Sequence, residues 1–88
     1  MQDHPTMAIA RRLKRANGHL ERIIKMVEQQ EPCARVAQQL QAVESAIESA
    51  KRLLIHDHIG HSLDLAYKTP GGRSRTTVKD LTLITKYL

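Results

Sequence analysis

The sequence is poor in aromatic residues and in cysteine. Its 88 residues include no Phe, no Trp, two Tyr and a single Cys. One cysteine excludes an intrachain disulfide framework, and a reducing cytoplasm is the compartment that fits such a chain. A chain of this length buries only a small core, so association of several copies is an expected source of stability.

Long apolar runs and enzyme signatures are also missing. No stretch approaches the roughly 18 apolar residues of a membrane-spanning helix, so we expect no membrane partner. The N-terminal residues MQDHPTMAIARR do not follow the order of a signal peptide. There is no Gly-x-Ser-x-Gly motif, no phosphate-cradling glycine loop and no pair of carboxylates in an apolar setting. The sequence therefore predicts a cytoplasmic protein that is not an enzyme.

Positive charge is plentiful and unevenly distributed. Residues 1–30 carry six Lys/Arg against three Asp/Glu, residues 31–64 carry three against five, and residues 65–88 carry five against one. Both ends are therefore basic while the middle is not. A localised basic surface suggests a polyanion such as nucleic acid as the partner. Solvated basic faces on a soluble protein are the alternative interpretation.

The stretch from Pro32 to Leu63 has the periodicity of one long helix. Its apolar residues recur with steps of 4, 3, 4, 3 and 4, which is a heptad seam on one helix face. The seam consists of Val36, Leu40, Val43, Ile47, Ala50 and Leu54. Cys33 and His58 continue the seam at its two ends, and His61 follows three residues later. The 25 residues between Cys33 and His58 span roughly 38 Å of helix, so one chain cannot bring them together.

An antiparallel second copy of this helix would place Cys33 beside His58 of the partner subunit. The helices would cross between Ser45 and Ala46, where small side chains permit close approach. A thiolate with imidazoles suits Zn, Ni, Co or Cu rather than Mg or Ca. The pattern therefore predicts a two-fold dimer with two composite metal sites. A buried inert cysteine, histidines that only cap the helix end, and a structural helical dimer without effector are the alternatives.

Two further helices flank the central one. The first is expected at about residues 6–29, on the apolar steps of Ile9, Leu13, Ala16, Leu20, Ile23 and Val27. Within it, Gly18 costs about 1 kcal/mol relative to Ala, which suggests that a neighbour packs closely there. Residues 1–5 are expected to form a flexible arm, 68–76 a loop and 77–87 a third helix. The prediction is a single all-α domain of three helices over residues 1–88.

A cluster of basic residues lies on the first helix: Arg11, Arg12, Lys14 and Arg15. It covers more than one helix face, and such clusters contact phosphates rather than base edges. No helix-turn-helix, zinc finger or aromatic stacking platform is evident. DNA binding would therefore depend on charge and groove shape and would be strongly sensitive to salt. His19 has no ligand spacing and is expected at the surface.

Four segments of the chain resemble a known family. They are 10–20 (ARRLKRANGHL), Cys33, 37–43 (AQQLQAV) and 53–61 (LLIHDHIGH). These segments, within about residues 8–64, resemble the CsoR/RcnR family of bacterial repressors, which includes copper, nickel/cobalt, persulfide and formaldehyde sensors. The tract 56–63 (HDHIGHSL) and the ending 84–88 (ITKYL) most resemble nickel/cobalt regulators of the NreA and DmeR kind.

The resemblance implies an assembly and a set of functional residues. Central helices pair antiparallel in a dimer, two dimers form a tetramer, and a double-stranded DNA operator is bound until the effector releases it. Cys33 and His58 match two family ligands from different subunits, while the third ligand position is Ser62 here. His61 is the adjacent substitute, and the N-terminal histidine ligand of nickel/cobalt sensors is matched by His4. On the DNA side, Arg12 and Arg15 match family contact positions, and Lys51 and Arg52 are further candidates.

The departures from the family pattern indicate which of the family's effectors suit this chain. Ser62 removes the second thiol of copper sensors, so the resemblance favours Ni(II) or Co(II), with Zn(II) and Cu(I) as alternatives. Persulfide sensing would need a cysteine where His58 stands. Formaldehyde sensors carry a proline directly after the initiator Met, where this chain has Gln2, and they remain an alternative of the same fold. A small helical enzyme, the last alternative, would need a cationic pocket inside the bundle.

Overall fold

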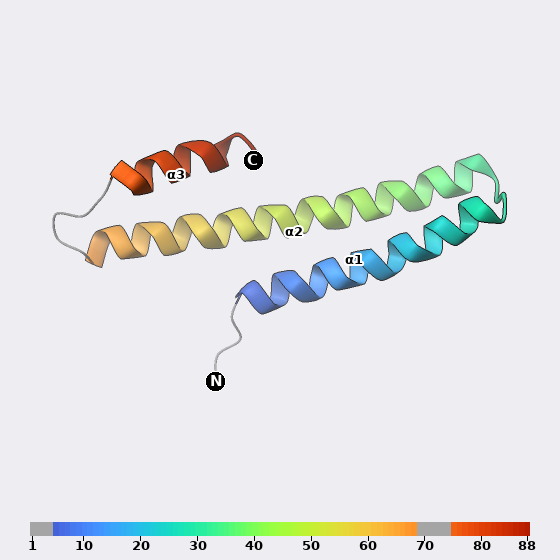
Figure 1. The fold of residues 1–88 in the computed structure, drawn as a ribbon, viewed down its shortest axis with the longest axis horizontal. Helices are drawn as coiled ribbons and strands as arrows, with labels where there is room; N and C mark the ends of the chain where they lie inside the picture. Colours follow the sequence, from blue (N-terminus) through green and yellow to red (C-terminus); the bar gives the residue numbers. More distant parts are fainter. Residues whose placement is uncertain (1–4, 69–74) are drawn as a thin grey trace. The chain divides into compact units, whose positions relative to one another are not determined.

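The computed structural model of the chain consists of three α-helices (Figure 1). It describes residues 5–68 and 75–88. Helix α1 spans Pro5–Glu28, α2 spans Cys33–Lys68 and α3 spans Arg75–Thr85. No strand occurs within the two described ranges. The all-α class and the order of three helices are therefore confirmed.

The helix ends lie close to the predicted ones. Helix α1 begins and ends one residue earlier than expected, and α3 begins and ends two residues earlier. Helix α2 begins at Cys33 rather than Pro32 and runs to Lys68, five residues past Leu63. The predicted arm and loop fall largely on residues 1–4 and 69–74, which lie outside the described residues.

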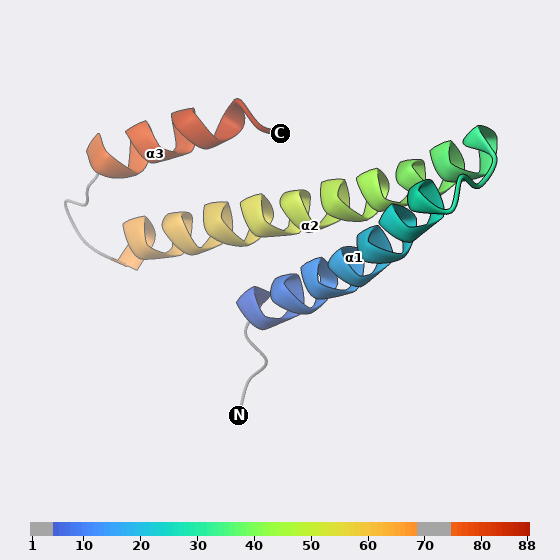
Figure 2. The ribbon, with the colours of Figure 1, turned by 45° about the vertical axis from the view of Figure 1, so that its right-hand side comes forward.

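The chain divides into two compact units, Met1–Lys51 and Arg52–Leu88, and α2 contributes to both. In the first unit, α1 and the N-terminal part of α2 lie antiparallel and side by side (Figure 1), and Figure 2 shows the same pairing from a second direction. The short connection between the two helices dictates this hairpin arrangement. The second unit holds the C-terminal part of α2 together with α3.

The turn between α1 and α2 closes the first helix with a complete C-terminal cap. Gln30 adopts a left-handed backbone conformation with φ of 59°. The amide of Glu31 donates to the carbonyl of Met26 at 3.0 Å, and the amide of Gln30 donates to that of Val27 at 3.0 Å. These two bonds form a Schellman motif, which satisfies carbonyls that the helix end leaves open. Pro32 then starts α2 by accepting hydrogen bonds from the amides of Arg35 and Val36.

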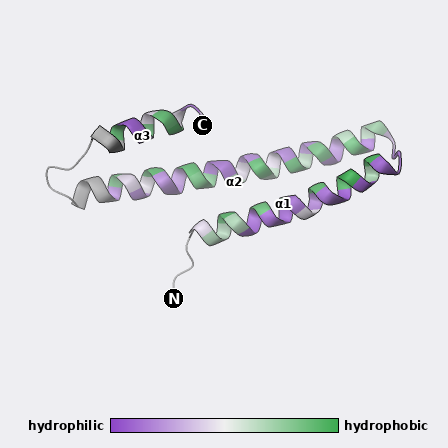
Figure 3. Ribbon diagram, in the orientation of Figure 1, coloured by the Kyte–Doolittle hydropathy of each residue, from purple (hydrophilic) through white to green (hydrophobic). Residues whose placement is uncertain are grey.

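Only half of each apolar seam is buried within the hairpin. Ile9, Ala16 and Ile23 are buried on α1, and Val43 and Ala50 are buried on α2, at intervals of seven residues. The other half of each heptad pattern is exposed, and Figure 3 shows hydrophobic segments recurring between hydrophilic ones along both helices. The exposed residues of the two patterns in this unit are Leu13, Leu20, Val27, Leu40 and Ile47. Leu54 continues its row along α2 and is also exposed.

One packing expectation, at Gly18, needs correction. A Cβ atom added at Gly18 would meet nothing within 4 Å, so within the described chain no neighbour packs closely against this glycine. On α3, Leu81 and Ile84 are half-buried, whereas Val78 and Leu88 are exposed. Helix α3 is only 11 residues long, and its single partner in this unit covers one side of it.

Candidate metal centre and basic surface

The two ends of the predicted composite site lie on one continuous helix. Cys33 is the first residue of α2 and carries a free, exposed thiol. His58 lies 25 residues further along the same helix and is half-buried. Because a helix rises about 1.5 Å per residue, one α2 helix holds the two residues apart. Any site that uses both must draw them from two chains.

His58 is held by a carboxylate from α3. Its Nε2–H donates to Oδ2 of Asp80, and Ser62 Oγ lies 3.5 Å from the same nitrogen. An imidazole that donates one N–H to a carboxylate presents its other ring nitrogen to a metal in a fixed orientation. The contact therefore leaves Nδ1 of His58 as the nitrogen suited to ligation.

Sequence reasoning missed Asp80 as a partner of His58. Asp80 lies on α3, 22 positions from the histidine in sequence. One signal could have found it, because Asp80 lies next to Leu81 and one turn before Ile84 on the half-buried side of α3. A carboxylate on the packed side of a short helix lies within reach of polar groups on the helix that it packs against.

The described residues do not assemble a complete metal site within one chain. Among them, no group of three or more His, Cys, Asp or Glu side chains is arranged to hold a metal. His61 is exposed on α2, and His4 lies outside the described residues. Of the predicted ligands, His58 is the one that the fold pairs with a carboxylate, that of Asp80, which the sequence did not predict.

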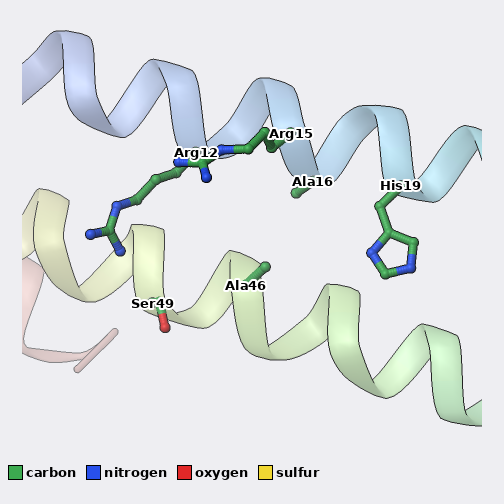
Figure 4. A pocket seen from close by; sticks show the side chains of 6 residues that line it. All are labelled: Arg12, Arg15, Ala16, His19, Ala46 and Ser49. Carbon is green, nitrogen blue, oxygen red and sulfur yellow. The ribbon is translucent and has the colours of Figure 1, made fainter.

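The basic residues of α1 are all exposed, but they fall into two groups. Arg12 and Arg15 line a hollow of about 420 Å³ between α1 and α2, whereas Arg11 and Lys14 are not among its lining residues. Figure 4 shows the arginines on α1 above the facing turns of α2. The described residues that line it are Arg12, Arg15, Ala16, His19, Ala46 and Ser49.

His19 is not the free surface residue that its spacing suggested. Its Nε2 lies 2.7 Å from Oε1 of Gln39 on α2, and the side chain is half-buried. The hydrogen bond joins the two helices of the hairpin at one end of the hollow. The sequence offers one clue to this hydrogen bond, because Gln39 lies one helical turn before the buried Val43, on the same side of α2.

The candidate DNA contacts on the central helix, Lys51 and Arg52, do not line this hollow. Lys51 Nζ lies 3.4 Å from Oε1 of Glu48 on the preceding turn, and Arg52 is exposed. The Lys51 and Glu48 side chains are 39% and 41% exposed, so this ion pair adds little to stability and a phosphate could compete for the lysine.

Comparison with known proteins connects these features to one family. The family model described as "Metal-sensitive transcriptional repressor" matches residues 6–86. The chain is 38% identical over 74 residues to the copper-sensing transcriptional repressor CsoR of Mycobacterium ulcerans, covering 84% of this chain and 62% of that protein. It is 40% identical over 52 residues to CsoR of Mycobacterium tuberculosis, covering 59% and 44%. It is 34% identical over 62 residues to RicR of Mycobacterium tuberculosis, also named copper-sensing, covering 70% and 65%. No solved structure matches the chain.

The comparisons support the family more than the subtype. The chain spans 62% of the first CsoR and 44% of the second. These relatives are named copper-sensing, so they give no support to the expected nickel/cobalt branch. The family description names a regulator of transcription, which agrees with the prediction that the chain is not an enzyme. Within the described residues, no helix is both long and apolar enough to cross a membrane. The chain belongs to the metal-sensitive transcriptional repressors, the CsoR/RcnR family that its sequence motifs resemble.

Proposed function

We propose that the protein is a cytoplasmic repressor that binds double-stranded DNA and releases it when a transition metal binds between two subunits. The observation that carries the proposal is the divided heptad pattern of α2. Val43 and Ala50 are buried in the hairpin, while Leu40, Ile47 and Leu54 stay 40%, 45% and 51% exposed. A helix with a second, uncovered row of apolar residues is suited to pairing with another helix.

The second helix is the α2 of another copy of the chain. Antiparallel pairing about the midpoint between Ser45 and Ala46 covers the exposed row on both copies and places Cys33 beside His58 of the partner subunit. Both Ser45 and Ala46 are exposed and small, as close helix approach requires. Two such dimers joined in a tetramer are the assembly that the family resemblance implies.

The chemistry of the donor groups suits a transition metal. The exposed thiol of Cys33 and the Nδ1 nitrogen of the partner's His58 are the two principal ligands, with His61 and His4 as candidates to complete the set. Asp80 fixes the imidazole through its other nitrogen. Ser62, close to His58 Nε2, offers only a hydroxyl where a second thiolate would favour Cu(I).

Ni(II) or Co(II) is the effector that this donor set favours. One thiolate with imidazoles is a borderline set, whereas softer sets rich in thiolate select Cu(I). Cu(I) is the second candidate, because the relatives found by comparison are named copper-sensing. Zn(II) shares the same ligand preferences and is the third.

DNA is held through its phosphates. The contacts proposed for this surface are Arg11, Arg12, Lys14 and Arg15 of α1, with Lys51 and Arg52 of α2, all basic and none of them buried. Metal ligation at both ends of the α2 pair would favour one packing of the two helices. Because DNA prefers another packing, metal binding lowers DNA affinity, and DNA binding lowers metal affinity by the same factor.

The test is the DNA affinity of the purified protein, measured by fluorescence anisotropy with and without Ni(II), Co(II), Zn(II), Cu(I) or formaldehyde. We expect a loss of affinity of about 5- to 150-fold with the cognate metal. Cys33→Ala should abolish this response and leave the metal-free affinity unchanged. If Cys33→Ala keeps the full response, the metal-sensor proposal fails, and release by formaldehyde alone would replace the metal with the alternative effector.

A further inference from the structure

The hollow between α1 and α2 in the first unit has basic and neutral polar groups in its lining. Its polar lining consists of two guanidinium groups, one imidazole and one hydroxyl, from Arg12, Arg15, His19 and Ser49. Among the described residues that line it, none carries a carboxylate. Each guanidinium offers five N–H donors and no acceptor. The lining is therefore suited to a ligand that brings negative charge and several acceptor oxygens.

The two helices shape this hollow together. Ala16 of α1 and Ala46 of α2 have short side chains, which leaves space between the helices at this level. Figure 4 shows Arg12 reaching from α1 toward α2 near Ser49, and the ring of His19 pointing toward α2 at the other end. The hydrogen bond from His19 to Gln39 fixes the ring in place at that end. Polar side chains from both helices thus line one space, and His19 among them is fixed by a hydrogen bond across the hairpin.

We infer that this hollow is a discrete binding site for a phosphate group. Guanidinium groups recognise phosphate through paired N–H donors, and a serine hydroxyl can add a further bond. The inference deepens the proposed function, because it separates Arg12 and Arg15 from the other basic residues of α1. The hollow takes one phosphate in a saturable way, whereas a diffuse basic surface attracts anions without saturation.

Three variants with the same change in net charge test the inference. Arg15→Gln and Ser49→Glu alter the hollow, and Lys25→Gln removes an exposed positive charge elsewhere on α1. Inorganic phosphate is titrated at constant ionic strength, and binding is followed by NMR through backbone amide shifts. Wild type should saturate. Phosphate affinity should fall by at least about tenfold in the first two variants, since each loses a charge-assisted contact or gains repulsion, and by less than about twofold in Lys25→Gln.

The result that overturns the inference is a linear, unsaturated phosphate response in wild type, or an equal loss in Lys25→Gln and Arg15→Gln. Metal-sensitive DNA binding would survive either result, so this failure differs from a failure of the proposed function. A second titration with duplex DNA identifies the source of the phosphate. If the two hollow variants lose DNA affinity beyond Lys25→Gln, the hollow takes a backbone phosphate. If their phosphate affinity falls while their DNA affinity matches that of Lys25→Gln, the site binds a free anion. If wild type saturates with phosphate but binds no DNA, the hollow stands and the repressor proposal fails.

Discussion

His58 on α2 donates a hydrogen bond from Nε2 to Oδ2 of Asp80 on α3, and this contact joins residues 22 positions apart in the chain. Both side chains remain about two-fifths exposed, at 41% and 43%. A contact this open adds little to folding stability. Its value lies in orienting the imidazole, whose second nitrogen is then presented in a fixed direction.

Removal of the Asp80 carboxylate should therefore weaken metal binding more than it weakens the fold. We expect Asp80→Asn to lower metal affinity by about 10- to 100-fold, as the loss of an orienting partner does at other metal sites. Affinity is measured by competition with a chelator of known strength. Asp57→Asn, which removes the carboxylate adjacent to His58 in sequence, is the control and should change affinity little. Equal affinities for wild type and Asp80→Asn would contradict the orienting role.

The core of the hairpin offers a matched pair of isoleucines. Ile23 is 2% exposed and its neighbour Ile24 is 50% exposed. Ile23→Ala should lower the free energy of unfolding by about 2–4 kcal/mol, because it deletes buried methyl groups and leaves a cavity. Ile24→Ala should cost less than about 1 kcal/mol. Urea unfolding at equal protein concentration checks both values, and similar losses for the two variants would show that the hairpin core is placed wrongly.

The exposed row of α2 should be essential for association. Ile47→Lys places a charge in the middle of that row, so we expect sedimentation velocity to show monomers where wild type forms dimers or tetramers. Gln38→Lys puts the same side chain at an exposed polar position of the same helix and should leave the assembly intact. An unchanged sedimentation coefficient for Ile47→Lys would rule out this row as the interface.

The turn after α1 carries removable backbone strain. Gln30 has a φ of 59°, a conformation that costs an L-residue about 1–2 kcal/mol and a glycine almost nothing. Gln30→Gly should therefore stabilise the protein by about 0.5–1 kcal/mol, after the greater freedom of glycine in the unfolded chain is subtracted. Thermal unfolding should show a higher midpoint. A lower midpoint would mean that the Gln30 side chain contributes more than its backbone strain costs.

Periodicity in the sequence was enough to predict the helices but not how their apolar faces are shared. The steps of 4 and 3 located α1 and α2 within a few residues of their ends. The same steps presented Val43 and Ile47 as equivalent members of one seam, although only Val43 is buried in the chain. A heptad pattern contains two rows, and which row packs within the hairpin depends on how the turn at Gln30 directs α2.

The candidate site was predictable only where its residues share one helix. Cys33 and His58 were found because helical spacing relates them, and Ser62 was identified through the family resemblance. Asp80 and the hydrogen bond between His19 and Gln39 were missed, since each joins two helices and depends on tertiary packing. The hollow was missed for the same reason, because Ser49 lines one space with the α1 arginines only in the folded hairpin.

A mixing experiment tests the intersubunit site most directly. Cys33→Ala and His58→Ala chains are refolded separately and as an equal mixture, and high-affinity metal binding is counted. Each variant alone should have no such site, whereas random pairing should restore about a quarter of the wild-type number, because half of the dimers are mixed and each has one complete site. Recovery of metal binding in the mixture is the predicted result. No recovery, or wild-type binding by either variant alone, would contradict a site built from Cys33 of one chain and His58 of the partner subunit.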